Sequence, residues 1–219
     1  MTIHISKMTG KLEGFQAIST NTVSNEYCQK QYKKQDAKNI CTFCYSHNML
    51  NTFRKNMQAS LQRNTDLLNS KVLHPDALPI INNAFFRFNA HGELALDKKQ
   101  GTINLENYVN IAIKNPHCTF SLWTKRFDII KPYFDTHEKP KNLILIYSSP
   151  LTNHIMTKVP KHFDKTFNTV VETDFVEKQN CTGQKCKDCL LCYKKDTTSI
   201  IVEKVKTYGK KKLQKILTK

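Results

Sequence analysis

Short apolar segments alternate with segments of helical length along this chain, and the alternation restricts the folds open to it. Residues 143–147, Leu-Ile-Leu-Ile-Tyr, form an uninterrupted apolar run, as in a strand that is buried on both faces of a sheet. Five further segments predict strands: 15–20, 84–88, 118–123, 169–172 and 200–205. Strands separated by helix-length segments predict right-handed βαβ units and a parallel sheet. Six strands are too few for a closed eight-stranded barrel, so we predict an α/β fold with an open or partial barrel.

Helical patterns occupy the segments between these strands. In 48–68 the apolar side chains recur every four residues, at Met49, Phe53, Met57 and Leu61. This pattern predicts one long helix, with Ser46 as its N-cap. Further helices are predicted at 104–114, 127–134 and 162–165. The Lys-rich stretch 208–219 predicts an exposed basic helix or a frayed end.

The chain divides into a principal domain and a cysteine-rich end. We expect a domain at 1–175, and at 176–219 a cysteine-rich cluster loop with a basic tail, packed on the same domain. No apolar run approaches the ~20 residues of a membrane span, and the first ten residues lack the apolar stretch of a signal peptide. These observations predict a soluble cytoplasmic protein without a membrane partner, in the host cytoplasm if the protein is viral.

The charge balance indicates a polyanionic partner. Lys and Arg total 34 against 18 Asp and Glu, which gives a formal net charge of +16. Such a charge favours binding to nucleic acid. The alternative is that AT-rich coding has enriched the chain in Lys, because most of the excess is Lys rather than Arg. A hydrophobic content of 39% excludes a chain that is disordered throughout.

Three cysteines follow the first predicted strand. Cys28, Cys41 and Cys44 have the spacing C-x12-C-x2-C, in the polar segment before the predicted long helix. Three thiolates can hold three irons of a 4Fe-4S cluster and leave the fourth iron open to a substrate or cofactor. The start of the following helix would place partial positive charge beside such an anionic cluster.

Four more cysteines lie close together near the end of the chain. Their spacing is C-x4-C-x2-C-x2-C, at Cys181, Cys186, Cys189 and Cys192. Two consecutive C-x2-C steps are typical of ferredoxin-like ligation, and four thiolates complete a closed cluster suited to electron transfer or structure. The eighth cysteine, Cys118, lies in a predicted apolar strand and is expected to be a small core residue.

Structural zinc is the alternative for both cysteine groups. Cys41 and Cys44 together with a C-x2-C pair of the second group would make a tetrahedral four-thiolate site. Zinc needs only four ligands, whereas seven are available, and overlapping C-x2-C-x2-C is uncommon around one zinc ion. We therefore favour one or two iron–sulfur clusters over zinc.

The end of the strand at 84–88 is a candidate ligand-binding segment. It continues as Asn89-Ala90-His91-Gly92-Glu93. The carboxyl ends of parallel strands are where ligands bind, Gly92 allows close backbone approach, and Glu93 can accept a hydrogen bond from a ligand amine. The alternative is an ordinary glycine turn with solvated His91 and Glu93.

A second strand end carries aromatic and basic side chains. Trp123, Lys125 and Arg126 end the strand predicted at 118–123. They could stack on a nucleotide-like ligand and neutralise it. A core Trp beside basic side chains that reach solvent is the alternative.

The cysteine segment after the first strand, the C-x2-C-Tyr sequence and the strand-end His-Gly-Glu together resemble the radical S-adenosylmethionine (SAM) superfamily. This resemblance implies a partial (βα)6 barrel, with Cys28, Cys41 and Cys44 as cluster ligands. It also implies a SAM site in which Glu93 contacts the amine, beside Gly92 and Asn89. The four-cysteine group would be an auxiliary cluster. The usual superfamily spacing is C-x3-C-x2-C, and the usual glycine pair before Glu is His91-Gly92 here.

A narrower resemblance covers nearly the whole chain. The segments KMTGKLEGFQAISTN, CTFCYS, FFRFNAHGE and GQKCKDCLLCY look like the gene product 88 family of small phage and mobile-element proteins. This likeness implies a fold and a cluster rather than an activity. Two functions stay open: a radical enzyme acting on a nucleotide or nucleic acid, and a non-catalytic iron–sulfur or zinc accessory protein of a phage that binds nucleic acid.

Overall fold

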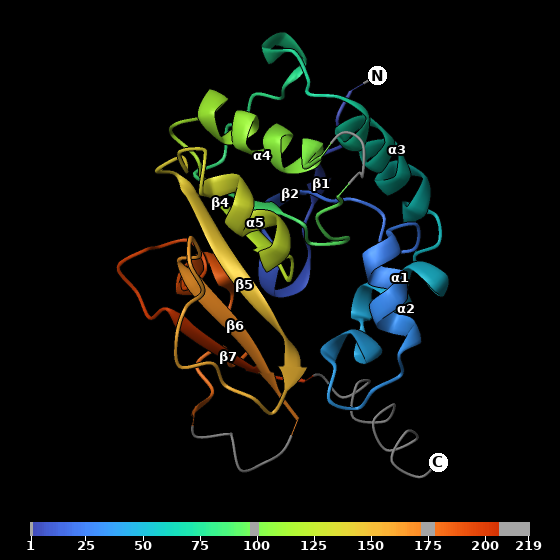
Figure 1. Cartoon of the computed structure of the whole chain (residues 1–219), viewed down its shortest axis with the longest axis vertical. Helices are drawn as coiled ribbons and strands as arrows, with labels where there is room; N and C mark the ends of the chain where they lie inside the picture. Colours follow the sequence, from blue (N-terminus) through green and yellow to red (C-terminus); the bar gives the residue numbers. More distant parts are fainter. Residues whose placement is uncertain (1, 97–100, 172–177, 206–219) are drawn as a thin grey trace.

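The computed structural model describes residues 2–96, 101–171 and 178–205, which form a seven-stranded open sheet with helices (Figure 1). The spatial order of the strands is their order in the chain, β1-β2-β3-β4-β5-β6-β7. The short β1 pairs antiparallel with β2, and every other neighbouring pair is parallel. The bounds are β1 Ser6–Lys7, β2 Gln16–Ile18, β3 Phe85–Phe88, β4 Thr119–Thr124, β5 Leu143–Thr152, β6 Lys165–Val170 and β7 Ile200–Lys204. This arrangement confirms the predicted α/β class.

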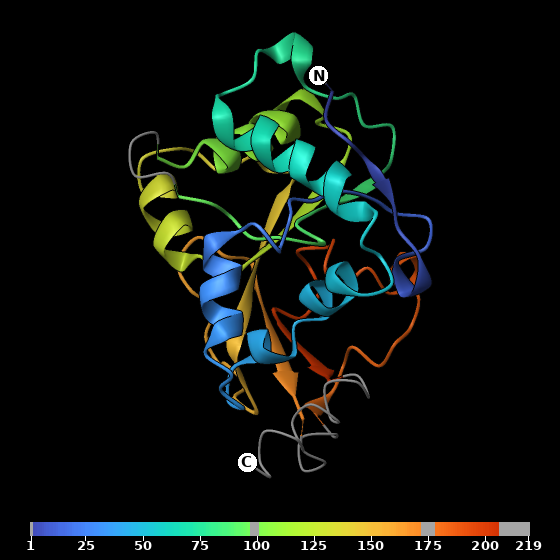
Figure 2. The same ribbon diagram turned by 90° about the vertical axis from the view of Figure 1, so that its right-hand side faces the viewer.

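Helices and 3-10 turns make the connections between the parallel strands. The helices are α1 Glu26–Lys33, α2 Tyr45–Asn51, α3 Met57–Ser70, α4 Ile103–Lys114, α5 Phe127–Phe134 and α6 Cys186–Cys189. The 3-10 turns are η1 Gly10–Leu12, η2 Ile40–Phe43 and η3 Pro75–Ala77. α3 packs against α4, and α1, α2 and η2 lie near the carboxyl end of β5 (Figures 1 and 2). None of the described helices has the length and apolarity that a membrane crossing requires.

The sheet has an apolar core on each face. Phe86 and Phe88 of β3 and the alternate residues of β4 pack with α3, α4 and α5 in the larger core. The smaller core, on the opposite face, consists of Ile144, Ile146, Phe167 and Ile201, with Trp123 and parts of the cysteine-rich segment packed against it. β5 contributes to both cores, which explains its uninterrupted apolar run.

Several predicted boundaries differ from those observed. β6 begins at Lys165, so residues 162–165 do not form the predicted helix. The helix predicted at 48–68 is divided into α2 and α3, and Phe53 between them is 70% exposed. The break follows the non-helical backbone of Thr52, the C-cap of α2, at φ −122° and ψ −103°. Cys44, not Ser46, is the N-cap of α2. The predicted helix at 208–219 lies outside the described residues.

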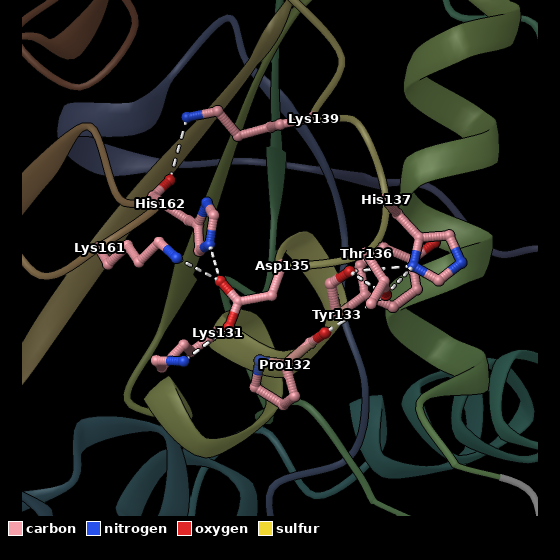
Figure 3. Close-up of polar contacts among 9 residues, drawn as sticks. All are labelled: Lys131, Pro132, Tyr133, Asp135, Thr136, His137, Lys139, Lys161 and His162. Carbon is pink, nitrogen blue, oxygen red and sulfur yellow. Dashed lines mark hydrogen bonds and ion pairs between the residues drawn. The ribbon is translucent and has the colours of Figure 1, made fainter.

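A charged cluster ties elements together at the amino ends of the strands (Figure 3). The Asp135 carboxylate, just after α5, lies 2.6 Å from Lys131 Nζ, 2.7 Å from Lys161 Nζ and 2.7 Å from His162 Nε2. Hydrogen bonds from these three groups, with that from His162 the largest, lower the pKa of Asp135. The cluster joins the end of α5 to the segment before β6. It lies at the amino ends of the strands, whereas the cysteines that follow β2 lie at the carboxyl ends.

Candidate functional site

A cavity of about 500 Å³ lies where the parallel strands end. Its wall includes the segments that follow β2, β3 and β4, together with the ends of β6 and β7. Six of the seven clustered cysteines line it: Cys28, Cys41, Cys44, Cys181, Cys186 and Cys192. The remaining one, Cys189, is not among the lining residues, and its sulfur accepts a hydrogen bond from Gln184 Nε2 at 3.5 Å. The fold thus brings two distant cysteine groups to one cavity.

The first cysteine group is held by asparagine caps. Asn25 is the N-cap of α1; its Oδ1 accepts from the Cys28 N–H at 3.0 Å, and its Nδ2 donates to the Glu93 carbonyl at 3.0 Å. Asn39 caps η2 in the same way and accepts from the Cys41 N–H at 2.9 Å. Cys28 was predicted in a loop, but it lies in the first turn of α1. Each of these cysteines is therefore placed near the positive start of a helical turn.

Burial keeps thiols of this group protonated when no metal is bound. Burial is the largest cause that raises the pKa of Cys28 well above its usual value, and the nearby Glu93 carboxylate adds to it. The pKa of Cys41 is also raised by burial, against an opposing effect of the Lys125 ammonium. Binding of iron or zinc would have to displace these protons, so the affinity for metal should rise with pH.

The second cysteine group forms its own neighbourhood. Burial raises the pKa of Cys192 to about 12; the Arg87 guanidinium opposes this, and the other cysteines of the group add to it. Lys11 Nζ lies 3.5 Å from the Cys181 sulfur and also pairs with Glu203. Cationic side chains thus stand beside both cysteine groups, as an anionic cluster would require.

The cysteines do not converge on a single point. Within 2–96, 101–171 and 178–205, no group of three or more His, Cys, Asp or Glu side chains is placed to hold one metal ion. A single tetrahedral zinc ion needs such convergence. In a 4Fe-4S cluster each thiolate binds a different iron, so its cysteines stand around a volume. The thiols that line the cavity thus do not form a preformed site for one metal ion in the described parts of the chain.

Glu93 is buried, with 4% of its surface exposed, and serves first as a structural acceptor. Its Oε1 accepts from the Leu94 N–H at 2.9 Å and from the Thr124 hydroxyl, and its Oε2 accepts from the Lys125 N–H at 2.9 Å. These bonds tie the end of β3 to the end of β4. A carboxylate accepts about four hydrogen bonds, so about one position is left for a ligand donor.

Gly92 is required by the packing of the protein itself. Its φ is +79°, and a Cβ at this position would lie 2.1 Å from Thr20 Oγ1 and 2.7 Å from the Thr20 carbonyl oxygen. Asn89, with φ +56°, accepts from the Tyr108 hydroxyl at 2.9 Å, while its buried Nδ2 has no partner among the described residues. Asn89 thus lines the cavity, and its buried amide has one donor without a partner among the described residues.

His91 is a buried residue of a hydroxyl network. Its Nδ1 lies 2.7 Å from Ser46 Oγ, and Ser46 Oγ lies 2.5 Å from Thr22 Oγ1. Thr22 Oγ1 also accepts a hydrogen bond from the Gly92 N–H at 2.8 Å. Burial, followed by the charges of Arg87 and Arg54, lowers the pKa of His91 to about 4, so it is neutral at pH 7. His91 and Glu93 are 7% and 4% exposed, so the alternative of a solvated glycine turn is wrong.

The aromatic and basic strand end differs from its prediction. Arg126 does not line the cavity: it pairs with Asp128 at 2.8 Å and donates to the Leu94 carbonyl at 3.0 Å. Trp123 and Lys125 do line the cavity, but the Trp123 ring is already covered by Arg87 at 4.4 Å and by Phe167 at 4.4 Å. Trp123 is thus not open for stacking on a nucleotide base.

Two cavity residues were missed from the sequence. Arg87 is the charged residue of the strand Phe-Phe-Arg-Phe, and its alternation with the core residues Phe86 and Phe88 places it on the opposite face, at the cavity. That alternation was a usable signal. Lys11 reaches the cavity from η1, and nothing in its local sequence indicates this.

Fold and site together define an α/β protein with a cysteine-lined cavity at the carboxyl edge of an open parallel sheet. The family model described as Gene product 88 matches residues 7–195, a range that contains all eight cysteines. The chain therefore belongs to the gene product 88 family. No curated protein and no solved structure matches it.

Proposed function

We propose that this protein is an iron–sulfur protein with a partial (βα)6, radical-SAM-like architecture, acting on a nucleotide or nucleic acid. The observation that carries the proposal is the single cavity that six clustered cysteines line beside Glu93. Cys28, Cys41 and Cys44 would hold a cluster with an open iron, and Cys181, Cys186, Cys189 and Cys192 a closed one. A reduced cluster with an open iron would supply the electron that cleaves SAM.

The protein's own residues support binding of such groups. Burial favours the neutral form of Lys125, but Cys41, Glu93 and other neighbouring groups outweigh it and raise the pKa of the ammonium, which therefore stays charged beside the first cysteine group. The remaining acceptor position of Glu93 and the unpaired Nδ2 of Asn89 offer one acceptor and one donor to an amino-acid moiety. Glu93 and Asn89 would bind and orient this amino-acid moiety, and the buried His91 holds the segment 89–93 in place.

Metal analysis tests the proposal. Protein purified without oxygen, or reconstituted with iron and sulfide, is expected to be brown and to contain iron with acid-labile sulfide, because seven cysteines stand ready as ligands. Incubation of the reduced protein with SAM should then yield a SAM cleavage product. Stoichiometric zinc without sulfide would contradict the cluster assignment, whereas sulfide without SAM cleavage would favour the non-catalytic alternative.

A non-catalytic accessory protein that binds nucleic acid is the second candidate. α1 and the turn after it expose Lys30, Lys33, Lys34 and Lys38 close to the cavity residue Tyr32. These charges add to the formal net charge of +16 and could follow a phosphate backbone.

Salt dependence tests this candidate. Binding to DNA or RNA is expected to weaken with salt, with a slope of about −0.7 to −0.9 per phosphate contact. Changing Lys30 and Lys34 to Gln should make the slope shallower, whereas the same change at the exposed Lys141 and Lys158 should not. If the two double variants changed the slope equally, α1 would not be the binding surface, and the excess of Lys would be attributed to AT-rich coding.

A further inference from the structure

Arg87 occupies the inner face of the sheet at the cavity. It lies opposite Ser121 of β4 in the parallel register, on the face away from the larger core, and lines the cavity. Its guanidinium stacks on Trp123, with its central carbon 4.4 Å from the ring centroid. Stacking on an indole holds a guanidinium flat and leaves its in-plane N–H groups available for hydrogen bonds.

No acidic side chain neutralises this cation within the described parts of the chain. Arg87 Nε is removed from solvent without a hydrogen-bond partner, and Arg87 takes part in no ion pair there. Among the other basic residues that line the cavity, Lys11 pairs with Glu203, and Lys125 Nζ donates to Ser148 Oγ at 3.1 Å. Arg54 also lines the cavity and is in no ion pair of the described chain, but unlike Arg87 it has no buried nitrogen without a partner. A partly buried guanidinium without a counter-ion is costly, so its place in a cavity wall points to an anion supplied from outside the chain.

We infer that Arg87, held on Trp123, is the anchor for an oxyanion, a carboxylate or phosphate, carried by the small molecule that occupies this cavity. A guanidinium binds such groups through two parallel hydrogen bonds. The volume of about 500 Å³ lies in the range of small-molecule sites, about 300–1,000 Å³. The inference thus narrows the ligand to a small anionic molecule or a single extruded nucleotide.

Two of the cations that line the cavity, Lys125 and Arg87, lie at different ends of it. Lys125 donates its N–H to Glu93 Oε2 at 2.9 Å, in the segment that follows β3. Arg87 instead stacks on Trp123, which packs against the smaller core as Cys181 and Cys192 do. If the proposed function holds, SAM lies at the Lys125 end, where Glu93 is. The oxyanion at Arg87 then belongs to the substrate, whose other end faces the first cysteine group.

The single tryptophan makes the inference testable. Trp123 is the one Trp in the sequence and lies against Arg87, so its fluorescence reports on this site. The full chain, both metal-free and reconstituted with iron and sulfide, would be titrated with inorganic phosphate, succinate and SAM at constant ionic strength. We expect a saturable change with phosphate or succinate. Arg87→Gln should weaken it by about tenfold or more, as for a hydrogen bond between charged groups, and Arg87→Lys by less.

The controls separate this inference from the cluster proposal. Lys141→Gln removes an exposed cation that does not line the cavity and should leave the anion response unchanged. The metal-free titration does not depend on cluster assembly, so an absence of iron would leave it standing. No saturable response, or an equal response in folded Arg87→Gln, would overturn the inference. Loss of iron in Arg87→Gln without any anion response would also overturn it, because Arg87 would then be the counter-ion of a cluster. A response to SAM alone would show that the oxyanion at Arg87 is the SAM carboxylate and not a group of the substrate.

Discussion

Changing Cys41 to Ala is expected to remove about half of the bound iron and to abolish any SAM cleavage, while the protein stays folded. The physical reason is that Cys28, Cys41 and Cys44 form one neighbourhood: besides burial and Glu93, Cys44 and Cys41 contribute to the raised pKa of Cys28, and besides burial, Cys44 contributes to the raised pKa of Cys41. A three-thiolate cluster that loses one ligand has only two left. Cys192→Ala should remove the other half of the iron and spare SAM binding. The cysteines that influence Cys192 are those of the second group and not those of the first.

Iron and sulfide content, with electron paramagnetic resonance of the reduced protein, would measure this division. Cys118→Ala is the matched control, since Cys118 is fully buried in the larger core, away from the cavity lining. It should cost some stability and no iron. If Cys41→Ala or Cys192→Ala lost all iron in a folded chain, one mixed site would replace the two-cluster assignment. Cys189→Ala should likewise remove the second cluster and cost stability, because Cys189 is one of the four thiolate ligands of the proposed closed site.

Gly92→Ala is expected to destabilise the protein by about 3 kcal/mol. A positive φ costs an L-residue about 1 kcal/mol, and overpacking in a tight contact adds about 1–3 kcal/mol. Here the new Cβ would meet both the side chain and the backbone of Thr20. For a chain of this size the loss corresponds to a fall in Tm of about 6–12 °C.

Gly14→Ala isolates the steric part of this prediction. Gly14 also has a positive φ, +90°, but a Cβ there would have no heavy atom within 4 Å. Its substitution should therefore show only the backbone cost, a fall in Tm of about 2–4 °C. Thermal unfolding followed by circular dichroism measures both. Equal falls in the two variants would show that Thr20 moves aside and that the glycine is not required by packing.

Local patterns were enough to predict the framework of the fold. The apolar run at 143–147 predicted a strand buried on both faces, and β5 does contribute to both cores. The order of strands and helices predicted parallel pairing, because neighbouring strands joined by crossovers lie side by side. The short antiparallel β1 was missed, since two residues carry too little periodicity to indicate a strand.

The sequence by itself determined the two cysteine groups and the strand ends that could carry ligands, because spacing and alternation are local properties. Only the tertiary structure decided what these residues face. It placed Cys28 and Cys192 at one cavity, gave three acceptor positions of Glu93 to protein donors, and left Arg87 without an acidic partner in the described chain. Such outcomes depend on contacts between segments far apart in sequence and on which buried polar groups find hydrogen-bond partners. A local sequence pattern contains neither kind of information.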